Sequence, residues 1–371
     1  MTAESNMAVR LGLALLRARG FDGALFRFRC GSESSCQSGV GGVTLTRWSK
    51  VAIFLAMILA AVAVPVPAHA TFPGMNGLIA FTSGTDAGSQ LFTVRPNGSD
   101  LRQITHLDGD AVNVDWAPDG RRIVFAIGRE DSARIAVARP DGSRLRVLPQ
   151  PEGVFDDQPS FSPDGRTIYF ERFTVATTDS AIWRMSSDGS HQRRVLGPFP
   201  DGFVTDPNVA PDGKTLSFQG FDGSVTGPPP ELEPARGLFT ADVDGGHITQ
   251  IRPYTADVTV KADWAPSGRR IAVTENANFF HPEDSANIVT MRPDGSAVRE
   301  VTHFHDGQTN AFLGSYSPDG RWLVFRFEIG GLFGLYRMHP DGTHRKVILA
   351  PSEFRPSLID WGPRATNRHG F

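Results

Sequence analysis

The chain has 371 residues, of which 40% are hydrophobic and 10% aromatic, and its formal net charge is −3. This composition excludes wholesale disorder, and the 39 glycines and 27 prolines favour a turn-rich β protein over a helical one. Residues 1–70 hold seven of the 37 basic and three of the 40 acidic residues, so residues 71–371 keep 30 basic and 37 acidic residues, a net charge near −7. We therefore expect no binding to nucleic acid, because phosphate neutralisation needs a basic surface.

An uncharged apolar run occupies residues 51–66, after Arg47 and Lys50 and before an Ala-x-Ala sequence at 68–70. This pattern predicts a secretory signal peptide that is cleaved after Ala70, and hence a secreted, periplasmic or cell-envelope location. The membrane would then be involved only through this segment before cleavage. The alternative is a retained membrane anchor, although the prolines at 65 and 67 make the run short for spanning.

Residues 1–42 do not fit an export signal. We expect translation to start near Val43, so that residues 1–42 are absent from the natural protein; the alternative is a disordered extension. Both cysteines, Cys30 and Cys36, precede the predicted cleavage site. The exported portion is therefore expected to be stabilised by packing and ring closure, without a disulfide.

One phrase recurs along the chain: an aromatic or apolar residue, a small residue, Pro-Asp-Gly, a basic residue and an apolar run. It starts at Trp116, Phe161, Val209, Trp264 (with Ser267 in place of the Asp), Tyr316 and, in truncated form, Trp361. Pro fixes φ and Gly supplies a positive φ, so each copy predicts a tight turn that joins two strands. Counting a degenerate copy that ends at Gly77, the turn glycines are 43 to 55 residues apart. Repeats of this period that carry only strands and turns indicate a β-propeller.

Each phrase is followed by two apolar strands, an Asp-Gly or Asn-Gly turn and a short outer strand, while the strand before the phrase completes a blade. The first blade lacks that strand, and residues 357–361 have no blade of their own. We therefore predict that residues 71–371 form a single all-β domain, a six-bladed β-propeller with four-stranded blades. Its ring is expected to close where the C-terminal strand joins the first blade beside Ile79 and Phe81. The aromatic residues of the phrase are expected to form the core between blades.

The repeated aromatic-Ser/Ala-Pro-Asp-Gly-Arg/Lys phrase, with its later Asp-Gly turn, resembles the repeat of TolB-type propellers, a branch of the WD-repeat-like propellers. The resemblance covers residues 72–364 and implies the six-bladed fold. TolB also has an amino-terminal α/β domain and acts in the Tol-Pal system, whereas here the signal-like segment runs directly into the first blade, which argues against a Pal-binding role. Related propellers precede the hydrolase domain of prolyl-oligopeptidase-like enzymes, but this sequence contains no Gly-x-Ser-x-Gly motif.

Strand alternation predicts that the two kinds of short turn share one face of the ring, while the longer, irregular loops share the other. Binding residues usually lie on irregular loops of a rigid scaffold, so we expect the ligand at the long-loop face. Phe279 and Phe280 could contact a partner there, or fold back over their own blade. Six polar residues at or near the start of the inner strands are the candidate ligand-binding residues of the channel mouth, or else cap the backbone: Asn113, Gln158, Asp206, Lys261, Asn310 and Arg355.

The blade-to-blade loops contain candidate metal ligands. His303, His305 and Asp306 suit zinc, with His106 or Asp108 to supply a further ligand, and the acidic residues around the channel would suit calcium. The alternative is that these loops are simply solvated, and no cofactor is required by the fold.

Two functions remain open from the sequence. The first, which we favour, is an exported, non-enzymatic and monomeric propeller that binds a protein or another cell-envelope ligand. The second is a propeller enzyme, a lyase or hydrolase, with a His/carboxylate or metal site at the channel mouth. Histidines within hydrogen-bonding reach of a carboxylate inside a pocket would favour the enzyme.

Overall fold

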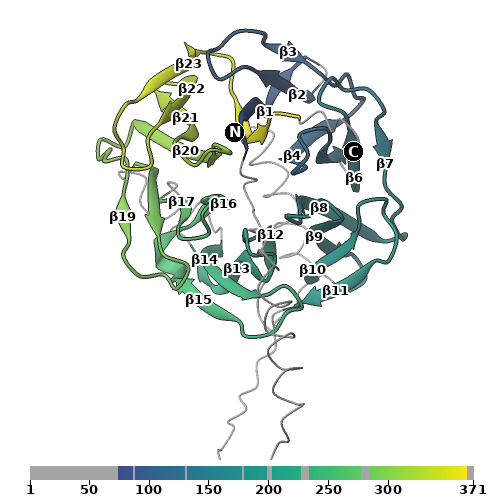
Figure 1. Ribbon diagram of the computed structural model, residues 1–371. Coiled ribbons are helices and arrows are strands. Elements are labelled where there is room, and N and C mark those ends of the chain that lie inside the picture. The colour runs from purple at the N-terminus through teal and green to yellow at the C-terminus, as the bar shows by residue number, and fades with distance from the viewer. Residues whose placement is uncertain are drawn as a thin grey trace, which may run out of the picture. The chain divides into compact units, whose positions relative to one another are not determined.

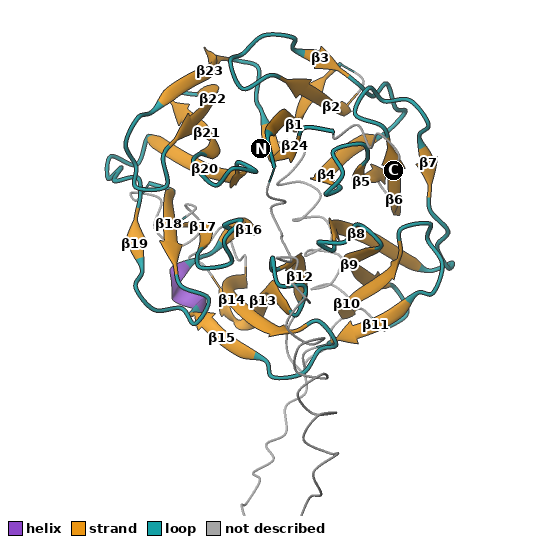
Figure 2. Ribbon diagram, in the orientation of Figure 1, coloured by secondary structure: helices purple, strands orange, loops and turns teal. Residues whose placement is uncertain are grey.

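The computed structural model describes residues 74–365, apart from 87, 130–131, 178, 199–202, 227–233 and 277–284. Within these residues the chain forms six antiparallel sheets of four strands each, arranged in a ring (Figure 1). Strands dominate, and one short 3-10 helix, η1 (Tyr254–Ala256), precedes the fifth blade (Figure 2). The predicted fold class is therefore confirmed. The predictions for residues 1–70, and for Phe279 and Phe280, lie outside the described residues.

The strands of each blade are given from the inner to the outer edge. Blade 1 contains β24 (Ser357–Pro363), β1 (Asn76–Thr85), β2 (Gly88–Val94) and β3 (Arg102–Gln103). Blade 2 contains β4 (Asp110–Trp116), β5 (Ile123–Arg129), β6 (Ser132–Ala138) and β7 (Arg146–Val147). Blade 3 contains β8 (Val154–Phe161), β9 (Thr167–Thr174), β10 (Asp179–Ser186) and β11 (Arg193–Leu196).

The other three blades follow the same order. Blade 4 contains β12 (Val204–Val209), β13 (Thr215–Thr226), β14 (Pro234–Asp242) and β15 (Thr249–Arg252). Blade 5 contains β16 (Thr259–Trp264), β17 (Ile271–Glu275), β18 (Asn287–Met291) and β19 (Arg299–Glu300). Blade 6 contains β20 (Thr309–Tyr316), β21 (Leu323–Ile329), β22 (Leu332–Met338) and β23 (Lys346–Ser352).

The ring closes within blade 1, where the C-terminal strand β24 pairs with β1. Ile79 lies opposite Trp361, and Ala80 lies opposite Asp360. This pairing removes the open edge that each of the two strands would otherwise expose, and it connects the two ends of the described chain. The predicted closure is confirmed.

The Pro-Asp-Gly turns have the geometry that their residues favour. In blade 2 the backbone N–H of Gly120 donates to the carbonyl oxygen of Ala117 at 2.9 Å. Asp119 Oδ1 accepts from the backbone N–H of Arg121 at 2.9 Å, and Gly120 has a φ of 63°. A positive φ favours glycine, so the turn depends on it.

The aromatic residues that open the repeated phrase are buried between blades. Trp116 packs against Leu91 of blade 1 and Ile123 of blade 2 within one apolar cluster, and only 2% of its surface is exposed. Its counterparts are buried to the same degree: Phe161, Trp264, Tyr316 and Trp361. These large side chains hold neighbouring sheets together, as predicted. Within the described part of the chain, no helix is both long enough and apolar enough to span a membrane.

Candidate functional site

Each inner strand has an irregular register, a feature that the propeller fold itself does not require. Each inner strand pairs with the second strand of its blade through a register shift. In four blades a residue at this shift adopts the left-handed conformation, namely Asn113 (φ 55°), Gln158 (52°), Asp206 (52°) and Leu358 (47°). Asn and Asp tolerate this region better than most residues, and such bulges redirect the neighbouring side chains. Three predicted channel-mouth residues are therefore bulge residues.

The bulge in blade 3 places two carboxyl groups opposite each other, since Asp157 on β8 pairs in register with Glu171 on β9. Asp157 Oδ1 accepts from Asn113 Nδ2 at 2.7 Å and from the backbone N–H of Gln158 at 2.6 Å. Thr205 Oγ1 donates to Glu171 Oε2 at 2.5 Å. Because Asn113 and Thr205 come from blades 2 and 4, this polar network joins three consecutive blades.

The protonation of this network differs from that of exposed carboxylates. The pKa of Glu171 is raised to about 8, mainly by desolvation. The hydrogen bond from Thr205 opposes this rise, and the negative charges of Asp157 and Asp206 add to it. Desolvation also raises the pKa of Asp157, against the hydrogen bonds that it accepts. Both side chains are half-buried. At neutral pH the carboxyl group of Glu171 is therefore mainly protonated, and it can donate as well as accept a hydrogen bond.

The next pair along the same two strands is a buried ion pair. Arg172 donates from Nε to Asp156 Oδ1 at 2.6 Å and from Nη2 to Oδ2 at 2.7 Å. The two side chains are 4% and 3% exposed. Desolvation raises the pKa of Asp156 even though Arg172 lowers it. This bidentate geometry compensates for burying the charges and fixes the register of blade 3.

A second polar group lies on blades 6 and 1, where cations outnumber anions. Arg326 Nη1 donates to Ser357 Oγ at 2.6 Å, and its Nε lies 2.8 Å from Glu328 Oε1. Arg355 Nη2 lies 3.7 Å from the same carboxylate oxygen. The guanidinium of Arg326 also lies over the ring of Phe312, 4.3 Å from its centre. Blades 6 and 1 lie across the ring from blades 3 and 4 (Figure 1). The ring therefore has a cationic side, with Arg326 and Arg355, and a carboxyl-rich side, with Asp157 and Glu171.

The remaining predicted channel-mouth residues have different roles. Asn310 is buried, and its Oδ1 accepts from the backbone N–H of Ala286 at 2.8 Å, so it supports a loop. Arg355 belongs to the polar group on blades 6 and 1, together with Arg326 and Glu328. Lys261 lies on β16, and its side chain is outside the described part of the structure.

The predicted metal ligands do not gather into one site. Nδ1 of His303 lies 3.2 Å from Glu300 Oε2, and Nε2 of His305 lies 3.9 Å from Glu300 Oε1, with both imidazoles more than 60% exposed. Asp306 accepts from Thr309 and Ser285, and these hydrogen bonds hold the pKa of its carboxyl well below the usual range.

His106 and Asp108 lie in a different loop, between blades 1 and 2, where Nδ1 of His106 is 3.1 Å from Gln103 Nε2. Among the described residues, no three His, Cys, Asp or Glu side chains come together in a metal-binding arrangement.

Sequence reasoning missed Glu171, Arg172 and Arg326, which lie within regular strands rather than in loops. The available signal was a charged residue in the apolar strand of the repeat, as in Glu171 and Arg172 after Ile168-Tyr169-Phe170. The equivalent positions are uncharged in blade 2, with Ala126 and Ile127, and in blade 4, with Gln219 and Gly220.

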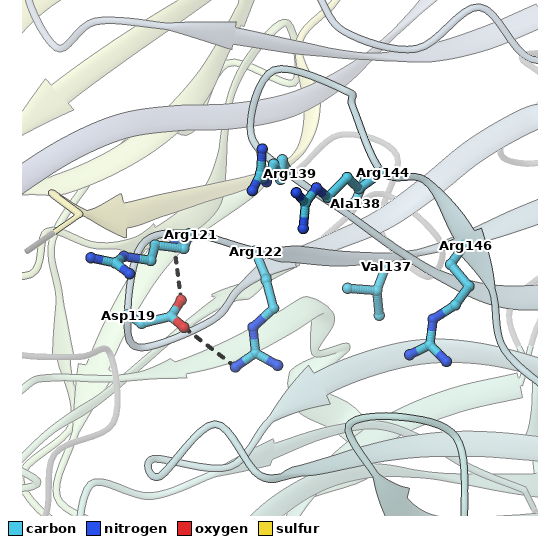
Figure 3. A pocket seen from close by; sticks show the side chains of 8 residues that line it. All are labelled: Asp119, Arg121, Arg122, Val137, Ala138, Arg139, Arg144 and Arg146. Carbon is cyan, nitrogen blue, oxygen red and sulfur yellow. Dashed lines mark hydrogen bonds and ion pairs between the residues drawn. The ribbon is translucent and has the colours of Figure 1, made fainter.

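A concave region also lies on the opposite, short-turn face. A cavity of about 350 Å³ is lined by both turns of blade 2: Asp119, Arg121, Arg122, Val137, Ala138, Arg139, Arg144 and Arg146 (Figure 3). The first and second turns of the blade therefore share one face, as strand alternation predicts. A neighbouring depression of about 1040 Å³ extends over blade 1 and shares Arg121 and Arg139 with the cavity. The sequence predicts the ligand at the long-loop face, so the concavity of the short-turn face is a feature that the sequence does not indicate.

Comparison with known proteins supports the fold. A family model described as the TolB beta propeller domain matches residues 66–212. The Tol-Pal system protein TolB of Anaeromyxobacter dehalogenans is 33% identical over 116 residues, which cover 31% of this chain and 24% of that protein. An uncharacterized protein of Agrobacterium fabrum is 31% identical over 168 residues, which cover 42% of this chain and 52% of that protein. The matches thus span between a quarter and about half of these relatives.

Two solved structures show the same architecture. TolB from Acinetobacter baumannii superposes with a TM-score of 0.59 at 18% identity, covering 87% of this chain and 74% of that chain. A putative TolB from Agrobacterium tumefaciens gives a TM-score of 0.55 at 16% identity, covering 78% of this chain and 99% of that chain. Identities this low support the fold only, and the function must be argued from the residues of the site.

Proposed function

We propose that this chain, a TolB-like six-bladed β-propeller, is an exported, non-enzymatic binding protein that recognises a protein or another cell-envelope ligand at its long-loop face. The observation that carries the proposal is the placement of the polar groups, with Asp157 and Glu171 on one side of the ring and Arg326 and Arg355 on the other. Half-buried carboxyl groups with raised pKa values destabilise the folded state at neutral pH, and the propeller does not need them for its packing. Their presence therefore supports a role in binding.

The charges on the two sides of the ring indicate the kind of ligand that the propeller suits. The carboxyl-rich side favours a cationic or hydrogen-bond-donating group, and the guanidinium groups around Arg355 favour an anionic group. Because these sides belong to blades on opposite sides of the ring, an extended ligand can contact both at once. A protein segment or an envelope polymer meets this requirement.

The positions of the histidines support binding over catalysis. The described histidines that contact a carboxylate, among them His303 with Glu300 and His247 with Asp242, are exposed. They lack the enclosed pocket in which a general base would act on a substrate. The enzyme remains the second candidate, with one observation in its favour: Glu171 has a pKa of about 8 and faces a second carboxyl group, an arrangement that suits proton transfer near neutral pH.

The proposed export rests on the apolar run at 51–66 and the Ala-x-Ala sequence that follows it. The similarity to a Tol-Pal system protein agrees with an envelope location. Amino-terminal sequencing of the native protein tests this part directly, and a mature chain that begins at Thr71 is the expected result.

Site-specific photo-cross-linking in cells tests the binding function. A photoreactive amino acid is placed at Arg355, in the blade-to-blade connection between β23 and β24. In a matched chain it is placed at Lys214, an exposed residue of the first turn of blade 4 on the opposite face. We expect a discrete cross-linked partner from position 355 and none from position 214.

The same experiment separates the two candidate functions. Identical adducts from both positions would contradict a ligand at the long-loop face. Turnover of an envelope component by the purified chain, lost in Glu171→Gln, would replace the binding proposal with the enzyme.

A further inference from the structure

The cavity of blade 2 on the short-turn face concentrates positive charge on an acidic propeller. Five arginines and a single carboxylate, Asp119, line its volume of about 350 Å³ (Figure 3). Asp119 is already engaged, because it accepts from the backbone N–H of Arg121 at 2.9 Å and lies 3.4 Å from Arg122 Nη2. The cavity therefore has an excess of about four positive charges, although residues 71–371 as a whole are acidic.

Two of these guanidinium groups are held in place by neutral acceptors. Arg122 donates to the carbonyl oxygen of Gly165 at 3.2 Å, and its guanidinium lies over the ring of Phe161, 5.3 Å from its centre. Arg146 donates to the carbonyl oxygen of Asp188 at 3.0 Å. These contacts orient both side chains. Arg146 is held by a neutral acceptor and keeps its charge for a ligand, whereas Arg122 also pairs with Asp119.

The arginines do not follow simply from the repeat. Five positions of the repeat, two after the first turn and three around the second, supply the five arginines in blade 2: Arg121, Arg122, Arg139, Arg144 and Arg146. No other blade has arginine at all five of these positions. Blade 5 is the most similar, with Arg269, Arg270, Arg292 and Arg299, but it has Ala297 at the position of Arg144.

Arg144 is the residue that distinguishes the cavity. Its φ is 55°, in the left-handed region, where a long side chain is uncommon. The other blades place Asp100, His191, His247, Ala297 and His344 at this position. The guanidinium of Arg144 completes the lining of the cavity, while the alanine of blade 5 provides no charge.

We propose that the blade 2 cavity is a binding site for a multiply charged oxyanion, a ligand that carries phosphate or carboxylate groups. Guanidinium groups match both kinds of oxyanion with paired, charge-assisted hydrogen bonds, and Val137 and Ala138 give the cavity an apolar floor. The volume admits a small anionic group rather than a folded domain. The adjoining depression shares Arg121 and Arg139, so a longer ligand anchored in the cavity can extend over blade 1.

Calorimetric titration of the full chain at low salt tests this site, which lies on the opposite face from the proposed long-loop site. The probes are tripolyphosphate for phosphate chemistry and citrate for carboxylate chemistry, each against chloride at matched ionic strength. The variant Arg139→Gln/Arg144→Gln changes two exposed residues. We expect it to weaken binding of the preferred probe by about tenfold or more, since two charge-assisted contacts are lost.

A matched control separates this site from the overall charge of the protein. Arg292→Gln/Arg299→Gln removes the same charge from the corresponding region of blade 5, and it should leave the affinity within about twofold, since only the long-range charge changes. The tighter of the two probes identifies the oxyanion class. Absence of binding to both probes, an unchanged affinity in the blade 2 variant, or an equal loss in both variants would overturn the proposal.

Discussion

Asp115 Oδ2 accepts a hydrogen bond of 2.8 Å from the backbone N–H of Phe161, the buried aromatic residue of the next blade. Comparable contacts join other neighbouring blades, from the residue just before each aromatic position: Asp360 with Trp116 at 2.8 Å, Asp263 with Tyr316 at 2.7 Å, and Ser315 with Trp361 at 2.8 Å. In these contacts a polar side chain of one inner strand accepts a hydrogen bond from the backbone of the neighbouring inner strand, and so positions that strand. The ring is thus held by hydrogen bonds as well as by its apolar core.

Removing one of these contacts should destabilise the propeller. Asp115→Ala leaves the backbone N–H of Phe161 buried without its acceptor, which costs about 1–3 kcal/mol of unfolding free energy. Urea denaturation of the variant and the parent chain measures this loss. Asp212→Ala is the matched control, because Asp212 is exposed and, among the described residues, bonds within its own turn, to Lys214 and Thr215. Equal stability of the two variants would show that the contacts between blades carry little energy.

Closure of the ring leaves no space for a side chain at Gly362, because a Cβ there would overlap the indole of Trp116. Gly362→Ala therefore forces β24 away from blade 2, and we expect it to lower the unfolding free energy by about 1–3 kcal/mol. The control is Gly84→Ala on β1, where an added Cβ meets no atom within 4 Å. Thermal denaturation of both variants checks the comparison. A melting temperature unchanged in Gly362→Ala would mean that the closing strand is loosely packed.

The ends of the inner strands could be predicted from the sequence, whereas their beginnings could not. The aromatic residue and the Pro-Asp-Gly turn mark each end, so counting back three residues identifies Asn113, Gln158 and Asp206 correctly as equivalent positions. Loops of different length precede the strands, and no residue marks their start. The prediction therefore places Asn310 and Arg355 six residues before the aromatic residue, whereas the bulge residue of the closing strand is Leu358, three residues before Trp361.

The carboxyl pair shows why the chemistry of the site was harder to predict than the fold. Phe161 pairs with Ile168 and Ser160 with Tyr169, and continuing that register would place Asp157 opposite Arg172. The bulge at Gln158 shifts the pairing by one residue and brings Asp157 opposite Glu171 instead. Alternation of apolar residues does not reveal a bulge. The pairing with Asp157, whose charge adds to the desolvation that raises the pKa of Glu171, is therefore visible only in the structure.

We expect the folded propeller to need no metal. The carboxylate of Asp306 is occupied by Ser285, Gln308 and Thr309, and His303 and His305 are exposed beside Glu300. A chelator should therefore leave the melting temperature of the full chain unchanged. Added zinc or calcium should raise it by less than about 1 °C, because a ligand raises the melting temperature only when it binds the folded state. A larger rise with zinc that disappears in His303→Ala/His305→Ala would restore the zinc site, and a rise with calcium alone would indicate a carboxylate site.

The stability of the propeller should depend on pH through Glu171. Its pKa is raised from 4.5 to about 8 in the folded chain, so between these values the folded state binds more protons than the unfolded state. The contribution of Glu171 to stability is then fully present below pH 4.5 and falls as the pH rises towards 8, by about 1.4 kcal/mol at most for each pH unit. Asp157, whose pKa is also raised, adds to this fall.

The variant Glu171→Gln tests this pH dependence, because it keeps the acceptor for Thr205 but cannot ionise. Urea denaturation at pH 5, 7 and 9 should therefore show the variant close to the parent at pH 5 and more stable at pH 9. Glu353→Gln, in an exposed loop, is the control and should follow the parent chain. A Glu171→Gln variant that loses stability with pH as steeply as the parent would show that Glu171 ionises normally in the ring, and the argument that its burial serves a ligand would fail with it.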